Sequence, residues 1–245
     1  PRLLRRQRQM CIRDRPIAEK QYEVVSFATC LDYETVEAGW KEHFPEIAPQ
    51  MREAAERVMA DTTTNTWDVV LEMLESGHNP VTLHQEIELY LKGRSRVEML
   101  RAFQTQPIEL FGASTGKNGW DHYLKGQRNI TFHPAITYGD TLEVLRRSKV
   151  LLNSTPFFKE GAHERIYNGM AAGAIVVTND NGYMRENFVP DKEVVLYNTL
   201  QGLEERVENL LANETIAPAA RKAVLANHTW DHRAIALLKS LKVAV

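Results

Sequence analysis

The sequence predicts an α/β protein in which a Rossmann-like parallel sheet carries an all-helical insertion. From residue 107 onward, short β-branched runs alternate with helical patterns, and strands separated by helices form parallel βαβ units. One earlier run of the same kind, Tyr22 to Thr29, lies before a long block, 35–106, that has only helical periodicity. This block is therefore expected to be an insertion behind the first strand.

Composition excludes several classes of protein. The chain has 245 residues, of which 43% are hydrophobic, and this suffices for a buried core. Its formal net charge of −2 gives no overall positive field that would attract nucleic acid. No apolar run approaches the roughly 20 residues of a membrane span. Two cysteines, Cys11 and Cys30, cannot form a disulfide framework, so we expect a cytoplasmic protein. From the charge and the apolar runs we expect neither a nucleic-acid partner nor a membrane span.

The first fifteen residues differ from the rest, since they contain six arginines and one aspartate. A basic tail for nucleic acid or anionic lipid is one interpretation. The other is that "RQRQMCIRDR" resembles a translated sequencing adapter, which would have to be excluded from fold reasoning. We favour the second, so residues 1–15 are expected to be a non-native or disordered arm, and the remainder is expected to be the C-terminal part of a longer protein.

The remaining segments, 16–34 and 107–245, are expected to form the sheet domain. Its predicted strands are 22–29, 108–111, 129–133, 150–153, 174–178 and 193–197, and its predicted helices are 142–148, 164–172, 184–188, 200–212, 217–227 and 230–242. Ligands of such sheets bind beyond the carboxyl ends of the strands. The loops expected at that edge are 29–33, 112–120, 134–140, 154–165 and 179–185.

One of these loops leads into the helix that begins near Glu164. The run Glu160-Gly161-Ala162-His163-Glu164-Arg165 would place free amides and the positive end of the helix dipole toward a phosphate or another anion. Lys159 and Arg165 add positive charge, and Glu160 or Glu164 could accept hydrogen bonds from sugar hydroxyls. In the alternative interpretation, Glu164 only complements the dipole and Lys159 is solvated.

Other motifs carry less information. "HERIY" lacks the second histidine of a zinc-protease motif, because Tyr167 stands there. "GASTGKN", which begins at Gly112, is too short between its glycines for a phosphate-binding P-loop, although Lys117 could still contact an anion. No Asp-x-Asp motif suggests a metal-held diphosphate. We therefore expect no metal and no cofactor, and we add Gly112 and the loop residues Asn181 and Gly182 to the candidate ligand-binding residues.

The stretch "LLNSTPFFKEGAHERIYNGMAAGAIVVTNDNGYMRENF", together with the later "HTWDHRA", resembles the nucleotide-sugar-binding half of GT-B glycosyltransferases, of the group 1 or CgeB-like kind. The resemblance covers 107–236, and "YEVVSFATC" is similar to the first strand of that half. It implies the donor half of a GT-B fold, a nucleotide-sugar donor as substrate, and an acceptor that the sequence does not identify.

In that family, a Glu-x7-Glu motif binds the donor. Its first glutamate contacts sugar hydroxyls and its second contacts the ribose. Glu160 and the following Gly161 fit the first position, whereas Asn168 occupies the second, and an amide lacks the charge that makes a carboxylate a strong acceptor. In another alignment, Glu164 matches the family's His-Glu-Arg glutamate, and His163 and Arg165 contact the diphosphate. Both alignments remain open.

The resemblance also implies a mechanism. A nucleoside diphosphate leaves the sugar as an acceptor attacks, and helix amides with Arg165, Lys159 or Lys117 stabilise its growing charge without a metal. The acceptor site and the catalytic base would belong to an N-terminal GT-B domain that is missing before Pro16, so this fragment is expected to bind the donor weakly and not to transfer sugar. Two alternatives are a GT-B-shaped sugar-nucleotide epimerase and a non-catalytic scaffold, which Asn168 favours.

Overall fold

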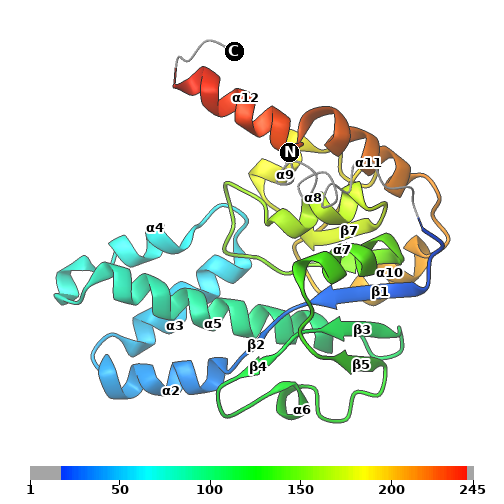
Figure 1. Ribbon diagram of the computed structural model, residues 1–245. Helices are drawn as coiled ribbons and strands as arrows, with labels where there is room; N and C mark the ends of the chain where they lie inside the picture. Colours follow the sequence, from blue (N-terminus) through cyan, green and yellow to red (C-terminus); the bar gives the residue numbers. More distant parts are fainter. Residues whose placement is uncertain (1–17, 242–245) are drawn as a thin grey trace.

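The computed structural model describes residues 18–241, and its centre is a six-stranded parallel sheet (Figure 1). The strand order is β5-β3-β1-β6-β7-β8, and every neighbouring pair is parallel. The strands are β1 (Tyr22–Phe27), β3 (Ile108–Phe111), β5 (Ile130–His133), β6 (Ser148–Leu152), β7 (Ile175–Asn179) and β8 (Val195–Tyr197). The predicted sheet is thus confirmed, and the predicted arm 1–15 lies outside the described residues.

Helices cover both faces of this sheet, as the alternating pattern requires. One face packs against the end of α5 and against α6 (Trp120–Tyr123) and α10 (Leu203–Leu210). The other packs against α7 (Tyr138–Arg146), α8 (Glu164–Ala171), α9 (Gly182–Asn187) and α11 (Ile216–Asn227). Consecutive residues of β1 serve opposite faces, because side chains alternate along a strand: Val24 belongs to the first core and Val25 to the second.

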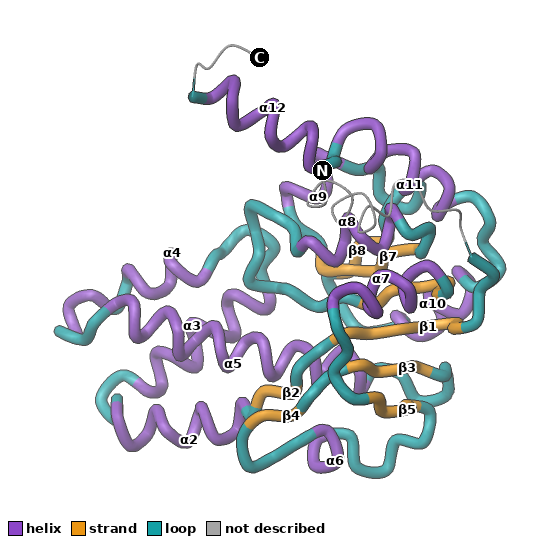
Figure 2. Tube along the Cα trace, in the orientation of Figure 1, coloured by secondary structure: helices purple, strands orange, loops and turns teal. Residues whose placement is uncertain are grey.

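The inserted block is all helical, as predicted, and it lies beyond the carboxyl ends of the strands (Figures 1 and 2). Its elements are α2 (Tyr33–His43), α3 (Ala48–Ala60), α4 (Thr66–Leu71), the 3-10 helix η2 (Leu74–Ser76) and α5 (Pro80–Arg101). It has a core of its own around Trp40, Met51 and Leu83. Helix α5 begins with Pro80 behind the capping side chain of Asn79, and its last turns join the sheet core through Val97 and Leu100.

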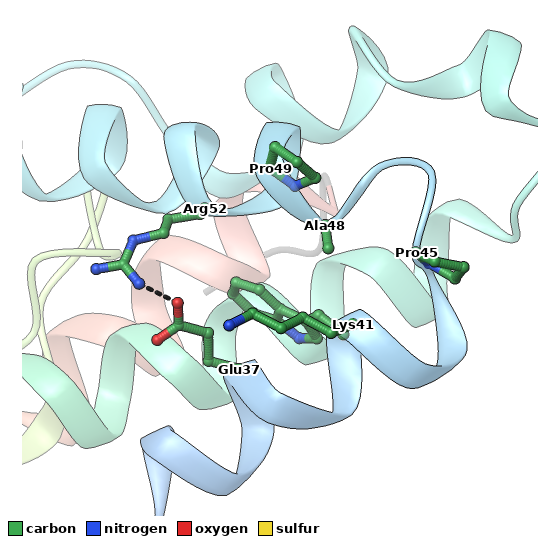
Figure 3. A pocket seen from close by; sticks show the side chains of 7 residues that line it. Glu37, Lys41, Pro45, Ala48, Pro49 and Arg52 are labelled. Atoms are coloured by element: carbon green, nitrogen blue, oxygen red, sulfur yellow. Dashed lines mark hydrogen bonds and ion pairs between the residues drawn. The ribbon is translucent and has the colours of Figure 1, made fainter.

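A small pocket of about 210 Å³ opens between α2 and α3 of this block (Figure 3). Its lining includes the ion-paired Glu37 and Arg52 and the buried Trp40. All of its lining residues come from 37–52, so it involves neither the sheet nor the loops at the strand ends.

Two short strands were not predicted. β2 (Cys30–Leu31) and β4 (Ser114–Thr115) pair in parallel just beyond the main sheet. The carboxylate of Asp32 fixes this region, because it accepts hydrogen bonds from the backbone amides of Lys117 at 3.0 Å and Asn118 at 2.8 Å. Its other oxygen accepts the hydroxyl of Tyr123 at 2.8 Å. Sequence periodicity gives no signal for two-residue strands held by a distant carboxylate.

The last helix, α12 (Trp230–Ser240), projects away from the rest of the chain (Figure 1). Its side chains are largely solvent-exposed, and Trp230 is 81% exposed. Among residues 18–241, every helix is too short or too polar to cross a lipid bilayer.

Candidate functional site

The connections of the sheet reverse direction at β1, which lies between β3 and β6. In open α/β sheets, ligands bind at the carboxyl ends of the strands where such a reversal occurs. Loop 153–163 leaves the carboxyl end of β6 and leads directly into α8. The junction predicted from sequence, around His163, therefore lies at the reversal point.

His163 is the N-cap of α8. Its Nδ1 accepts a hydrogen bond from the backbone amide of Arg165 at 3.1 Å, and its backbone carbonyl accepts the amide of Ile166 at 3.0 Å. Burial, together with the charges of Arg165 and Arg96, lowers the pKa of the imidazole to about 4. His163 is thus neutral at pH 7, with its proton on Nε2. Two amides predicted to be free are engaged, so this end attracts anions mainly through the helix dipole and nearby cations.

Those cations are Arg96 and Arg165. The Arg165 guanidinium lies 5.9 Å from the ring centroid of Phe27, at the end of β1. Arg96 reaches the same end from α5 and donates to the backbone carbonyl of Thr29 at 2.8 Å. Burial and the charge of Arg96 lower the pKa of Arg165 to about 10, while Glu164 partly offsets this shift.

Burial also lowers the pKa of Arg96. Within residues 18–241, neither Arg96 nor Arg165 forms an ion pair with a carboxylate, whereas other arginines such as Arg94 and Arg185 do. Two half-buried cations that lack an ion-paired carboxylate make this end of β1 a site that favours an anion. Sequence analysis missed Arg96, because the pattern of α5 shows that its last turns are helical but not that they reach β1.

Lys159 lies elsewhere than predicted. Its side chain is buried and points into the helical block, where Nζ donates to the backbone carbonyls of Val58 at 2.7 Å and Asp61 at 2.6 Å. The ammonium therefore caps the end of α3 and does not face the anion site. The role predicted for Lys159 at a leaving diphosphate is revised accordingly.

Three other predicted site residues have contacts or positions that the structure defines. Gly112 packs so closely on β1 that an added Cβ would overlap the backbone oxygen of Ala28. Asn181 is buried and caps α9, and its Nδ2 donates to the backbone carbonyls of Phe158 at 2.6 Å and Gly161 at 3.2 Å. The Lys117 side chain is exposed on the loop that Asp32 holds. None of these three is brought against Arg165 by a contact in the structure.

The remaining candidates lie on the open side of the junction. Glu160, Glu164 and Gly182 are exposed, and open space surrounds the Cβ position of Gly161. Asn168 is half-buried, and its Nδ2 donates to the hydroxyl of Tyr138 at 3.1 Å. These positions are therefore open to solvent or only partly covered.

A groove of about 510 Å³ runs along this side of α8. Its walls are mostly apolar and aromatic, with an amide and charged groups at its ends. The lining residues are Tyr138, Ala162, Glu164, Tyr167, Asn168, Ala171, Val224, Leu225, His228, Thr229, Trp230, Asp231 and Arg233. Ala162 and Glu164 line the groove and adjoin in sequence His163 and Arg165, which lie at the anion site. Residues 18–241 hold no group of three or more His, Cys, Asp or Glu side chains arranged for a metal ion.

The comparison with protein families decides the identity of this chain. Residues 94–239, more than half of the sequence, match the family described as glycosyl transferase-like. The chain belongs to this family. The matched region of the glycosyl transferase-like protein includes Arg96, the loop 153–163 and the whole of α8. No curated protein matches the sequence.

Solved structures share its fold. TarM superposes with a TM-score of 0.52 at 12% sequence identity, over 94% of this chain and 37% of TarM. A mutant of S. aureus TarM in complex with fondaparinux, alpha-GlcNAc-glycerol and UDP gives a TM-score of 0.53 at 11% identity, with the same coverage. AviGT4, a glycosyltransferase involved in avilamycin A biosynthesis, gives 0.47 at 13% identity, over 91% of this chain and 50% of AviGT4.

At these identities the likeness to TarM concerns the fold alone. It agrees with the fold class predicted from the sequence, an α/β protein with a Rossmann-like parallel sheet, which is confirmed. The chain spans 37% of the length of TarM.

Proposed function

We propose that this glycosyl transferase-like protein binds the diphosphate of a nucleotide-sugar donor between Arg96, Arg165 and the first turn of α8. One observation carries the proposal: two half-buried guanidinium groups at the reversal point of the sheet have no ion pair with a carboxylate in residues 18–241. A diphosphate supplies the missing negative charge, and arginine is suited to it because its planar fork can donate two hydrogen bonds to one phosphate.

The same groups would support sugar transfer. As the bond between the anomeric carbon and the diphosphate breaks, negative charge grows on the leaving oxygen. The dipole of α8 and both guanidinium groups are fixed beforehand at the place where this charge develops. The neutral His163 can add a hydrogen bond from Nε2–H. Because the chain itself provides the cations, we expect EDTA to leave donor binding unchanged.

The groove beside α8 is the proposed position of the nucleoside. Its lining residues Ala162 and Glu164 are neighbours in sequence of His163, and Tyr138 and Tyr167 offer aromatic surface for a planar base. Asn168 is half-buried in this groove and is the proposed contact of the ribose, and the exposed Glu160, three residues before the N-cap of α8, is the proposed contact of the sugar. This assignment accommodates both alignments of the sequence, with His163 and Arg165 on the diphosphate and Glu160 on the sugar.

Calorimetry with UDP, GDP, their monophosphates and their sugars tests the proposal. We expect the diphosphates to bind more tightly than the monophosphates, and Arg165→Met to abolish the difference. A matched control is Lys125→Met, which removes an exposed cation far from this loop in sequence. If no nucleotide binds, the proposal is wrong and a scaffold role for the helical block becomes the better explanation.

Transfer itself requires an acceptor and a catalytic base. As the resemblance to GT-B glycosyltransferases implies, we propose that another GT-B half supplies both, and that these 245 residues bind a donor without transferring its sugar. Assays with a radiolabelled UDP-sugar should then show neither transfer nor rapid hydrolysis. Steady turnover by these residues alone would contradict this part of the proposal.

A further inference from the structure

The loop that leads into the first turn of α8, residues 153–163, contacts both the helical block and the sheet domain. Its Phe157 is only 7% exposed and belongs to the core of the block, together with Tyr90 and Leu91 of α5. The ammonium of Lys92, also from α5, lies 5.1 Å from the centroid of the Phe157 ring. One side of this loop is thus packed as part of the inserted helices rather than as part of the sheet.

Lys159 ties the loop to the block a second time. Its buried Nζ donates to the carbonyls of Val58 and Asp61, where α3 ends. The last carbonyls of a helix have no partners within the helix and form the negative end of its dipole, so a cation is stabilised there. A buried ammonium is costly without such acceptors. The position of Lys159 is therefore determined by the end of α3.

The sheet side holds the same loop by different groups. The Asn181 amide, at the start of α9, donates to the carbonyls of Phe158 and Gly161, on either side of Lys159 and Glu160. The amide of Thr155 donates to the Asn179 side chain at 2.7 Å. The segment between these anchors leads directly to His163 and Arg165. A displacement of α3 that Lys159 follows would therefore act on the segment that connects these anchors to the anion site.

We propose that Lys159 is a positioning residue through which the helical block sets the geometry of the anion site, so that nucleotide binding and the end of α3 are coupled. The nucleotide part of this inference rests on the proposed function. Arg96 gives the block a second, independent connection to the same site, since it extends from α5 to Thr29. The inserted helices thus contribute to the geometry of the anion site through both Lys159 and Arg96.

Amide hydrogen exchange tests this inference in two arms. In the first arm no nucleotide is present, and Lys159→Met is compared with wild type. We expect exchange to accelerate about tenfold or more at the amides of 153–163 and at the end of α3, but not in α10. In the second arm, saturating UDP should slow exchange at the end of α3 in wild type and leave it unchanged in Lys159→Met. Lys125→Met, which removes an exposed lysine, is the control for both arms.

The arms separate the two proposals. If UDP does not bind wild type, the proposed function fails, and the first arm still tests the attachment of the loop. If UDP binds wild type but Lys159→Met exchanges like wild type throughout, the positioning role is wrong. If the variant does not fold, the second arm on wild type alone still tests the inference. Slower exchange at the end of α3 with UDP supports it. Unchanged exchange there, although UDP binds, overturns it.

Discussion

Arg96 of α5 and Arg165 of α8 both lie at the carboxyl end of β1. Arg96 donates a hydrogen bond to the carbonyl of Thr29, and the Arg165 guanidinium lies over the ring of Phe27. The charge of Arg96 lowers the pKa of Arg165, and burial lowers the pKa of both. The protein thus holds two like charges in a partly dry place, which costs free energy until an anion binds. Binding sites commonly contain such unfavourable arrangements, because the ligand completes them.

This relationship predicts opposite effects on binding and stability. Arg165→Met should weaken UDP binding at least about tenfold, because a charge-assisted contact is lost. Without ligand, the free energy of unfolding should stay the same or rise by up to about 1 kcal/mol, because the repulsion from Arg96 disappears and methionine still packs on Phe27. Calorimetry and urea denaturation measure the two quantities. A variant that is less stable and binds UDP normally would refute the assignment.

The pH dependence of stability should reveal His163. Its pKa in the folded protein, about 4, lies below the 6.5 of an unfolded chain. Between these values the unfolded state binds the proton and the folded state does not, so the free energy of unfolding falls as the pH falls from 6.5 to 4. A fully desolvated shift would amount to about 3 kcal/mol, and for this half-buried ring we expect about 1 to 2 kcal/mol.

The comparison to make is His163→Asn, which keeps an N-cap acceptor and removes the titrating ring. Above pH 6.5 the variant and wild type should have similar free energies of unfolding. Toward pH 4 the variant should lose less stability than wild type. Parallel curves across the whole range would show that the imidazole titrates normally in the folded state.

The part of this site that the sequence predicts is the part formed by neighbouring residues. Helix α8 and β7 follow from a polar start, small residues and a β-branched run, and the junction at His163 follows from their order. Gly169 shows why small residues are needed, since an added Cβ would press on Leu151 and Val176. The ligand edge of the sheet follows from the βαβ pattern, because all strands of a parallel sheet end at the same edge.

The rest depends on contacts between distant segments. From the sequence, Arg96 is simply a charged residue on a predicted helix. Only the structure shows that its guanidinium reaches Thr29 at the end of β1. From the sequence, Lys159 is predicted to be a solvated lysine or a phosphate ligand. Only the position of α3 in the structure shows that its ammonium caps that helix. Asp32 likewise fixes a loop more than eighty positions away in the chain. Periodicity reports which face of an element is buried but not its partner.

Gly112 and Gly161, both predicted to bind the donor, should now behave differently. Gly112→Ala should cost more than about 3 kcal/mol of stability, because the new Cβ would overlap the Ala28 backbone, which cannot move without disturbing β1. Gly161→Ala should cost less than about 0.5 kcal/mol, because nothing lies within 4 Å of its Cβ position. Thermal and urea unfolding measure both values. Similar costs for the two variants would contradict this distinction.

Asn168 offers a test in which affinity is gained. In the GT-B pattern that the sequence resembles, a glutamate stands here and accepts hydrogen bonds from the ribose, whereas Asn168 donates to Tyr138. Asn168→Glu should increase the affinity for UDP several-fold, since a carboxylate is the stronger acceptor. Position 168 is the fifth of the eight residues of α8, where the helix dipole contributes little, and its side chain is only half-buried, so stability should change little.

Two controls make this result specific. Tyr138→Phe in the wild-type background frees the Asn168 amide without adding charge, and UDP affinity should then change less than twofold. A 2′,3′-dideoxy nucleotide lacks the hydroxyls that the new carboxylate would accept, so Asn168→Glu should bind it no better than wild type does. If the variant gains affinity for the dideoxy nucleotide as well, the introduced carboxylate acts through the general field of the site, and the ribose does not lie beside this position of α8.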